Sequence, residues 1–165
     1  MKRLFATITA LLLLLTAGCS AEEPPQAQMV NPIRTVDSPE DFPDDLSTYL
    51  FVTEKAQDPA YSIISGEIAQ IRFTYQGAEF TLRGTYLEGD HSGVYGPFTE
   101  EEIALTLDHP KSGCNIQIRY TTGGIVVANW SISSMQFSLA SSKPTQEDDF
   151  QLLTDLIVSQ QLNLT

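Results

Sequence analysis

The segment that decides the fold is IAQIRFTYQGAEFTLRGTY, residues 68–86. Apolar residues alternate with polar ones on both sides of Gln76-Gly77, at Ala69, Ile71, Phe73, Tyr75, Ala78, Phe80, Leu82 and Tyr86. A period of two is typical of a strand with one buried face. The pattern therefore predicts two strands joined by a two-residue hairpin loop, in which Gly77 takes the positive φ that such turns need.

The predicted hairpin also fixes which residues face each other. A two-residue loop after Tyr75 places Phe73 opposite Phe80, on the same face of the sheet. A shift of one residue would bury Arg72 and Arg83 instead, so the apolar pattern specifies the register.

The same alternation continues further along the chain. Its apolar positions are Ile103, Leu105, Leu107, Ile116, Ile118, Tyr120, Val126, Ala128, Trp130, Ile132, Met135, Phe137 and Leu139. Apolar residues must face apolar residues across each turn. The apolar positions are even-numbered on both sides of the first turn, which requires an odd-length turn at Thr122-Gly123-Gly124, and they become odd-numbered after the second, which requires a two-residue turn at Ser133-Ser134. Residues 108–113 are rich in turn formers and predict a loop. With the first hairpin, these segments predict at least six strands, most of them antiparallel.

The last segment has helical periodicity. Its apolar residues recur at helical spacing, at Phe150, Leu153, Leu156 and Ile157. Thr145 is the expected N-cap, with Asp148 three residues later. Nearer the N-terminus, Ser38-Pro39-Glu40-Asp41 predicts a short helix or loop, which Pro43 limits to about one turn.

These elements predict an α+β fold, a twisted antiparallel sheet of six or more strands with the C-terminal helix packed on its apolar face. The other face is expected to be open to solvent. We call it the polar face, and its predicted residues are Gln70, Arg72, Thr74, Thr81, Arg83, Gln117, Arg119, Asn129, Ser131, Gln136 and Ser138.

The first 19 residues, MKRLFATITALLLLLTAGC, have the layout of an export signal, with a basic start, an apolar stretch and small residues before a cysteine. Only 15 uncharged residues separate Arg3 from Cys19, which is short for a spanning helix. Thr16-Ala17-Gly18-Cys19 is similar to a lipobox and predicts cleavage after Gly18 and a diacylglyceryl group on the Cys19 thiol. The alternative is an ordinary signal peptide with an incidental cysteine.

The composition predicts what this anchor would hold. Residues 19–34 are rich in Pro, Gln, Glu and Ala and predict a flexible tether, and residues 35–165 predict one domain. The formal net charge is −12, and it becomes −14 without Lys2 and Arg3. Such a charge excludes nucleic-acid binding by simple electrostatics and disfavours contact with anionic lipid. With Cys19 lipidated, Cys114 has no cysteine left to pair with.

Several segments together resemble a known family, namely NPIRTVDSPEDF, SGEIAQIRFTYQGAEFTLRGTY, HSGVYG and VVANWSISSMQFSL, followed by the closing helix. The chain is similar over residues 31–160 to small bacterial lipoproteins with an extracytoplasmic domain of unknown function. A similar domain occurs in some anti-sigma-factor and sporulation-related proteins. The resemblance implies a location and a shape, and it supplies no catalytic or ligand residues.

Candidate catalytic and metal-binding groups each have a structural alternative that we favour. Cys114 follows His109 by five residues, which makes the two a candidate thiol and base pair, but Cys114 shares the inward parity of Ile116 and is expected in the core. The segment around Glu88, Asp90 and His91 lacks the alternating oxygen ligands of a calcium loop and predicts a solvated turn.

Two further groups of residues are also explained more simply by structure than by function. The acids at 100–102 are adjacent in sequence and therefore point in different directions. Trp130 and Phe137 could form a sugar-stacking surface, but their parity favours the core. No metal ion or cofactor is expected.

Three of the basic residues, Arg72, Arg83 and Arg119, fall on the predicted polar face of an otherwise acidic domain. Guanidinium groups bind carboxylates and phosphates through paired hydrogen bonds. The hypothesis is an anion-binding or partner-docking face, with an envelope protein or an anionic wall polymer as the partner. The alternative is that the arginines pair with neighbours such as Glu79 and only solubilise the sheet.

The sequence therefore predicts a lipoprotein on the extracytoplasmic side of the cell membrane, acting as a non-enzymatic binding, sensing or docking module. The alternative is an envelope hydrolase or thiol enzyme, which would need convergent polar groups in a pocket. A regulatory role like that of the anti-sigma relatives would need a partner protein, because no spanning helix or cytoplasmic part is expected here.

Overall fold

The computed structural model describes residues 32–43, 46–107 and 114–164, with the backbone alone at 101–107. The predicted export signal with Cys19, the predicted tether up to residue 31 and the predicted loop at 108–113 lie outside the described residues. The strands are β1 (Ile33–Val36), β2 (Gln57–Ile64), β3 (Ile68–Tyr75), β4 (Ala78–Thr85), β5 (Phe98–Leu107), β6 (Cys114–Thr121), β7 (Val126–Ile132) and β8 (Met135–Ser141).

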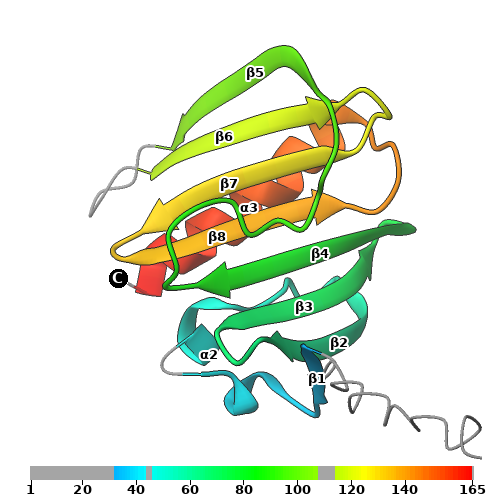
Figure 1. The fold of residues 1–165 in the computed structure, drawn as a ribbon. Coiled ribbons are helices and arrows are strands. Elements are labelled where there is room, and N and C mark those ends of the chain that lie inside the picture. Colours follow the sequence, from blue (N-terminus) through cyan, green and yellow to red (C-terminus); the bar gives the residue numbers. More distant parts are fainter. Residues whose placement is uncertain (1–31, 44–45, 108–113, 165) are drawn as a thin grey trace, which may run out of the picture. The chain divides into compact units, whose positions relative to one another are not determined.

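These eight strands form one sheet in the order β1-β2-β3-β4-β8-β7-β6-β5, and every neighbouring pair is antiparallel (Figure 1). Helix α3 (Glu147–Leu164) lies against one face. The predicted α+β class and the sheet-and-helix architecture are confirmed. No helix in the described part of the chain is long and apolar enough to cross a membrane.

The β3–β4 hairpin has the predicted register. Phe73 pairs with Phe80, and Tyr75 pairs with Ala78 across a two-residue loop. Gln76 and Gly77 both have positive φ, 49° and 81°, as a hairpin turn of matching twist requires.

The β6–β7–β8 meander also follows the predicted parity. Tyr120 pairs with Val126, and the three-residue turn ends at Gly124, which has a φ of 81°. Ser133 has a φ of 57° in the two-residue turn between β7 and β8. Trp130 consequently lies between Ile116 on β6 and Phe137 on β8.

The pairing of β4 with β8 joins the two halves of the sheet, and the sequence analysis did not assign it. It places Gly84 opposite Phe137. A Cβ at Gly84 would lie 3.0 Å from Leu50 and 3.2 Å from the Phe137 ring. The missing side chain therefore lets two large core residues approach the strand closely.

Two strands, β1 and β2, were not predicted. β1 begins at Ile33, so the sheet includes the last two residues of the segment assigned to the tether. β2 contains Pro59, which a central strand would not tolerate. β1 pairs with β2 only from Tyr61 to Ile64, so Pro59 lies where the outer side of β2 has no partner strand.

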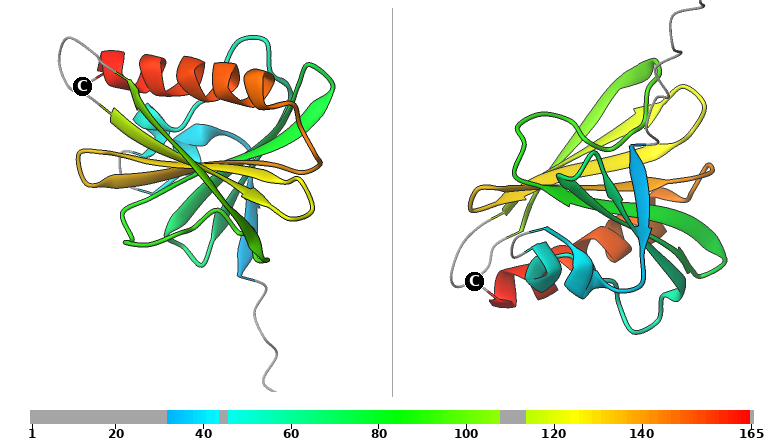
Figure 2. Two further views of the ribbon diagram at one scale, coloured as in Figure 1. Left: turned by 90° about the horizontal axis from the view of Figure 1, so that it is seen from above. Right: turned by 60° about the horizontal axis from the view of Figure 1, so that its bottom comes forward.

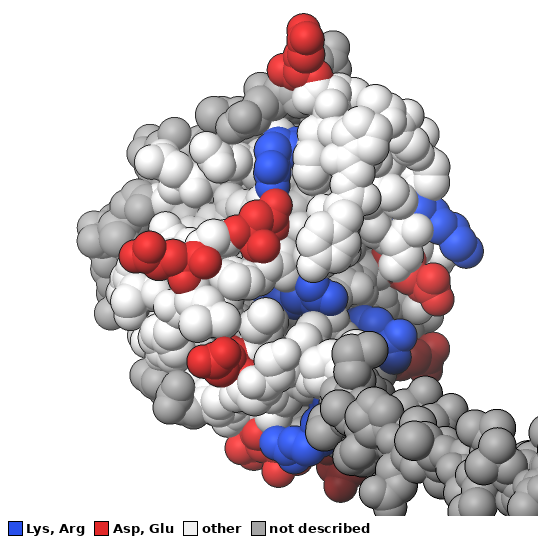
Figure 3. All heavy atoms as spheres, in the orientation of Figure 1, with Lys and Arg blue, Asp and Glu red and all other residues white. Residues whose placement is uncertain are grey.

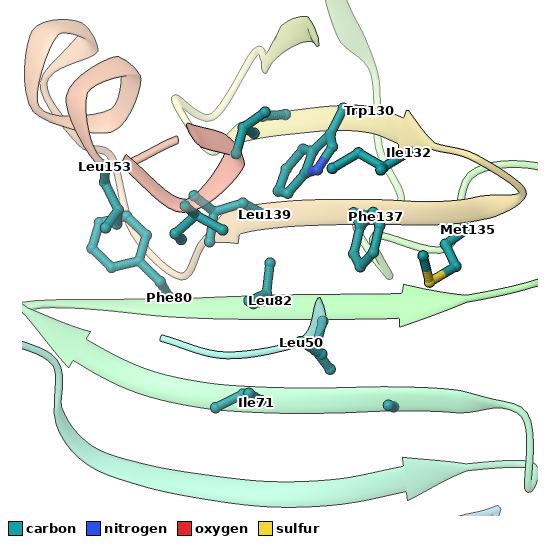
Figure 4. Packing of buried hydrophobic residues seen from close by; sticks show 14 of the residues in the cluster. Leu50, Ile71, Phe80, Leu82, Trp130, Ile132, Met135, Phe137, Leu139 and Leu153 are labelled. Carbon is teal, nitrogen blue, oxygen red and sulfur yellow. The ribbon is translucent and has the colours of Figure 1, made fainter. Parts of the chain in front are cut away.

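The core lies between the sheet and α3, with the short helix α2 (Leu46–Tyr49) on the same side of the sheet (Figure 2). In Figure 4, Trp130 and Phe137 lie next to each other on β7 and β8, and Leu153 of α3 lies next to Phe80 of β4. Leu46 and Leu50 close the part of the core near α2.

The start of α3 corrects the sequence analysis. The helix begins at Glu147, so Thr145 is not its N-cap, and the Thr145 hydroxyl instead donates to the Lys143 carbonyl. Acidic residues fill the first turn, where they favour the positive end of the helix dipole. In the segment before β2, Pro39–Asp41 form the expected single turn, as a 3₁₀ helix.

A buried amide connects α3 to the rest of the core. Gln161 is fully buried, accepts from the Trp130 indole N–H at 2.8 Å and donates to the Tyr49 carbonyl at 2.7 Å. The same side chain therefore ties the C-terminal end of α3 to β7 and to α2.

The face opposite α3 was expected to be open to solvent, but part of it is covered. The β4–β5 connection, residues 86–97, runs across it in front of β7 and β8 (Figure 1). Viewed along the sheet, this connection and α3 lie on opposite sides (Figure 2). Beneath and beside it, Gln70 and Ser138 are only 6% and 3% exposed, although both had been predicted to be solvated.

Candidate functional site

The three arginines lie on the polar face as predicted, but they do not form one cluster. Arg72 is on β3, Arg83 is on β4, and Arg119 is on β6, with β8 and β7 between the last two. Figure 3 shows one basic side chain near the top of this face, separated by acidic and neutral side chains from two others that lie close together near its middle. Each arginine therefore has its own surroundings.

Arg83 is half-buried and holds the β4–β5 connection against the sheet. Its Nε donates to Gln70 Oε1 and its Nη1 donates to the His91 carbonyl, both at 2.9 Å. Gln70 in turn donates to the Ser62 hydroxyl at 2.9 Å. Burial lowers the pKa of Arg83 from its ordinary value, while Tyr95 and Asp90 act in the opposite direction. The Arg83 guanidinium is therefore occupied by hydrogen bonds within the protein.

Arg119 makes the second contact to the same connection. Its Nη2 donates to Asp90 Oδ2 in an ion pair, and its guanidinium lies 4.4 Å from the centre of the Phe98 ring. Burial raises the pKa of Asp90, but hydrogen bonds from Ser92 and Arg119 and the Arg119 charge outweigh it, and the pKa lies below its ordinary value. Arg119 is therefore also occupied by contacts within the protein, to Asp90 and Phe98.

The turn between these contacts is built from small residues. Asp90 accepts from the Ser92 backbone N–H at 2.9 Å, and Ser92, within the connection itself, is buried. Gly93 has a φ of 74°, and a Cβ there would lie 2.1 Å from Arg83 Nη1. Only a glycine at this position allows the backbone to lie so close to the guanidinium.

Arg72 differs from the other two arginines. It is exposed, and neither an ion pair nor a hydrogen bond involves its side chain within the described ranges. It lines a hollow of about 380 Å³, which we call the Arg72 cleft. The other residues of the Arg72 cleft are Asp58, Ala60, Phe73, Thr74, Glu79, Phe80, Thr81 and Ser142.

The local structure explains how these residues meet. Arg72 lies opposite Ala60 on β2 and opposite Thr81 on β4, and the β2–β3 register shifts between Gln57 and Ala60. At this bulge Asp58 has a φ of 50°, a conformation that aspartate tolerates better than most residues. Bulges of this kind change the direction of a side chain.

The predicted candidates for metal binding are not brought together. Asp90 is engaged by Arg119, and His91 Nε2 lies 3.0 Å from the Glu88 carbonyl. Among the residues that the structure describes, no group of three His, Cys, Asp or Glu side chains is arranged to hold a metal ion.

The candidate nucleophile Cys114 lies in the core, as its parity predicted. It is 2% exposed, its thiol lies 3.7 Å from the Ser131 carbonyl, and burial raises its pKa. A raised pKa disfavours the reactive thiolate. His109, its proposed partner, lies outside the described residues.

The aromatic pair also belongs to the core, as predicted. The rings of Trp130 and Phe137 stack with their centres 5.8 Å apart, and both residues are buried. Neither ring is available for stacking on a sugar. Of the acids at 100–102, Glu100 is exposed, and the side chains of 101 and 102 lie outside the described residues.

Sequence reasoning identified Arg72, Thr74 and Thr81 as neighbours on the polar face but missed Asp58 and Ser142 in the same cleft. Asp58 belongs to the unpredicted strand β2, and Ser142 follows β8, where its backbone N–H donates to the Glu79 carbonyl at 2.9 Å. The Asp-Pro pair at 58–59, which interrupts an otherwise extended segment, is the available signal for the bulge.

Comparison with protein-family models, curated proteins and solved structures finds no match to this chain. The family resemblance drawn from the sequence motifs therefore stays a prediction.

Proposed function

We propose that this protein is a lipoprotein anchored through Cys19 on the extracytoplasmic side of the cell membrane, and that its domain binds a component of the cell envelope without catalysing a reaction. The binding surface in this proposal is the Arg72 cleft. The membrane contributes only the lipid anchor, because the strongly acidic domain is repelled by anionic lipid and by nucleic acid.

One observation carries the proposal, namely the guanidinium of Arg72, which lies in a hollow on the polar face and forms no ion pair or hydrogen bond with the residues that the structure describes. Arg83 and Arg119 are occupied by the β4–β5 connection. Arg72 makes no such contact among the described residues, and its planar guanidinium can bind a carboxylate or phosphate through paired hydrogen bonds. Its hollow also falls in the size range of small-ligand sites.

The test of binding compares the full-length lipidated protein with two variants in detergent. Arg72→Gln removes the free charge in the cleft, and Arg34→Gln is the matched control, because Arg34 is exposed on β1 and does not line the cleft. We expect the wild type and Arg34→Gln to sediment with purified envelope fragments and Arg72→Gln to stay in solution. Sedimentation of Arg72→Gln at the wild-type level would refute the proposal.

The test of location uses Cys19. We expect the wild type to incorporate labelled palmitate and to fractionate with membranes, and Cys19→Ala to do neither. A wild-type protein that keeps Met1, or that is found unlipidated in the medium, would contradict the anchor.

The enzyme alternative is not favoured by any side chain of the described segments. The buried thiol of Cys114, with its raised pKa, lacks the exposed and activated environment of a nucleophile. On the polar face, the side chains of Gln70 and Arg83 are engaged in structural hydrogen bonds.

A further inference from the structure

The Arg72 cleft contains charges of both signs that do not neutralise one another. Asp58 and Glu79 line it together with Arg72. Within the part of the chain that the structure describes, the side chains of these three residues form neither ion pairs nor hydrogen bonds. A ligand that carried both signs would satisfy all three groups.

The strand register sets the backbone positions of Arg72 and Glu79 in the cleft. Glu79 is the diagonal neighbour of Arg72, because Arg72 pairs with Thr81 and Glu79 lies two residues before Thr81. Diagonal neighbours across antiparallel strands are about 7–8 Å apart. Two residues of extended peptide span about 7 Å. The backbone spacing of Arg72 and Glu79 is therefore close to the length of a dipeptide, whose amine and carboxylate lie at its two ends.

The wall of the cleft adds neutral hydrogen-bonding groups. Thr74, Thr81 and Ser142 contribute hydroxyls that both donate and accept. A peptide bond has one donor and one acceptor, so these hydroxyls suit the centre of such a ligand. A second hollow of about 160 Å³ shares Ala60 and Arg72 with the cleft, and it offers room for a side chain beyond the carboxylate.

The same charges select against simpler ligands. A polyanion would meet two carboxylates beside the single guanidinium, on a protein with a formal net charge of −12. A simple amine would leave Arg72 unpaired and would be repelled by it. A ligand with one amine and one carboxylate avoids both penalties.

We propose that the Arg72 cleft binds the charged ends of a short peptide, with the carboxylate on Arg72 and the amine between Asp58 and Glu79. This inference rests on the proposed function, because it names the chemical class of ligand for the same cleft. It favours a peptide component of the envelope over an anionic wall polymer.

The experiment is ligand-observed saturation-transfer NMR on the full-length protein in detergent, with alanyl-alanine titrated into the millimolar range. Two blocked forms, N-acetyl-alanyl-alanine and alanyl-alanine amide, each lack one charge. We expect alanyl-alanine to bind and each blocked form to bind at least tenfold more weakly.

The variants assign each charge to its partner. With Arg72→Gln, we expect weaker binding of alanyl-alanine and no further loss from amidation. With Asp58→Asn combined with Glu79→Gln, we expect no further loss from acetylation. Arg34→Gln should bind all three compounds as the wild type does, because Arg34 lies outside the cleft. Blocked and free dipeptides binding equally would overturn the inference.

A third probe, polyglutamate, separates the two proposals. If polyglutamate binds through Arg72 and alanyl-alanine does not, the peptide inference fails while the binding function stands. If no probe binds and Arg72→Gln still sediments with envelope fragments, both proposals fail.

Discussion

The two faces of the sheet are covered in different ways. The face under α3 is filled by apolar side chains such as Phe150 and Leu153, both fully buried. The polar face is crossed by the β4–β5 connection, which is held by hydrogen bonds and one ion pair from Arg83 and Arg119. Burial of a large apolar side chain contributes about 1.5–3 kcal/mol, whereas a partly exposed ion pair contributes about 0–1 kcal/mol.

The two faces therefore differ in their expected roles: the face under α3 stabilises the fold, and the polar face carries the proposed binding surface. The helix face buries most of the apolar side chains, so a change at a buried position there is expected to lower the free energy of unfolding strongly. The polar face contributes less to the free energy of unfolding. It also carries polar side chains, such as Arg72, that have no hydrogen-bond or ion-pair partner among the described residues. A domain of this kind can change a residue such as Arg72 without losing its fold, which suits a binding surface.

The largest effect is expected on the helix face. Phe150 is fully buried and its ring centre lies 6.3 Å from that of Phe80. Phe150→Ala should lower the free energy of unfolding by about 3–5 kcal/mol, measured by urea denaturation, because it leaves a cavity. The matched control is Leu152→Ala, at an exposed position of the same helix, which should change it by less than about 0.5 kcal/mol.

The next effect concerns the polar group within the apolar face. Gln161→Ala would leave the Trp130 indole N–H and the Tyr49 carbonyl without their partner. We expect a loss of about 2–3 kcal/mol in thermal or urea unfolding. Gln160→Ala, one residue earlier and exposed, is the control and should be near neutral. Equal stability of the two variants would show that the buried amide does not connect α3 to the core.

A smaller effect is expected where the connection meets the polar face. Gly93→Ala requires a left-handed conformation and displaces the Arg83 guanidinium, which should cost about 1–2 kcal/mol. Hydrogen exchange of residues 86–97 should become faster while the core strands stay protected. Gly96→Ala, which has open space around it, should leave exchange unchanged. Slow exchange in both variants would mean that Arg83 does not hold the connection.

The smallest effect is electrostatic and depends on pH. The folded pKa of Asp90 lies below its unfolded value, so its stabilisation is complete above about pH 4 and is lost as pH falls through the folded pKa. Asp90→Asn should therefore be less stable than the wild type by under about 1 kcal/mol near neutral pH, and equal to it in strong acid. Urea denaturation across this pH range measures the difference.

The control for this titration is Glu88→Gln in the same connection. It removes the same charge at an exposed position that forms no ion pair in the described residues. A pH-dependent loss in Glu88→Gln as large as that in Asp90→Asn would contradict the role of the Asp90–Arg119 pair.

The apolar face could be predicted nearly pair by pair because burial imposes a strict period on the sequence. Phe73 with Phe80 and Trp130 with Phe137 follow from parity and turn length alone. β2 escaped prediction because Asp58 and Pro59 break its pattern, and β1 because four residues are too few to show a period.

The polar face was harder to predict for a physical reason. A polar residue at an outward position looks the same in sequence whether water or another segment covers it. Gln70 and Arg83 were therefore placed on the correct face, yet their burial and hydrogen bonds depend on where the β4–β5 connection lies. The strand order that puts Arg83 and Arg119 under one connection is set by long-range pairing, which local patterns do not contain.

The most direct test of the account is to measure stability and envelope binding together in Arg72→Gln. The account predicts a free energy of unfolding within about 0.5 kcal/mol of the wild type and a loss of sedimentation with envelope fragments. A variant that is equally stable and still sediments at the wild-type level would show that the polar face does not bind through Arg72.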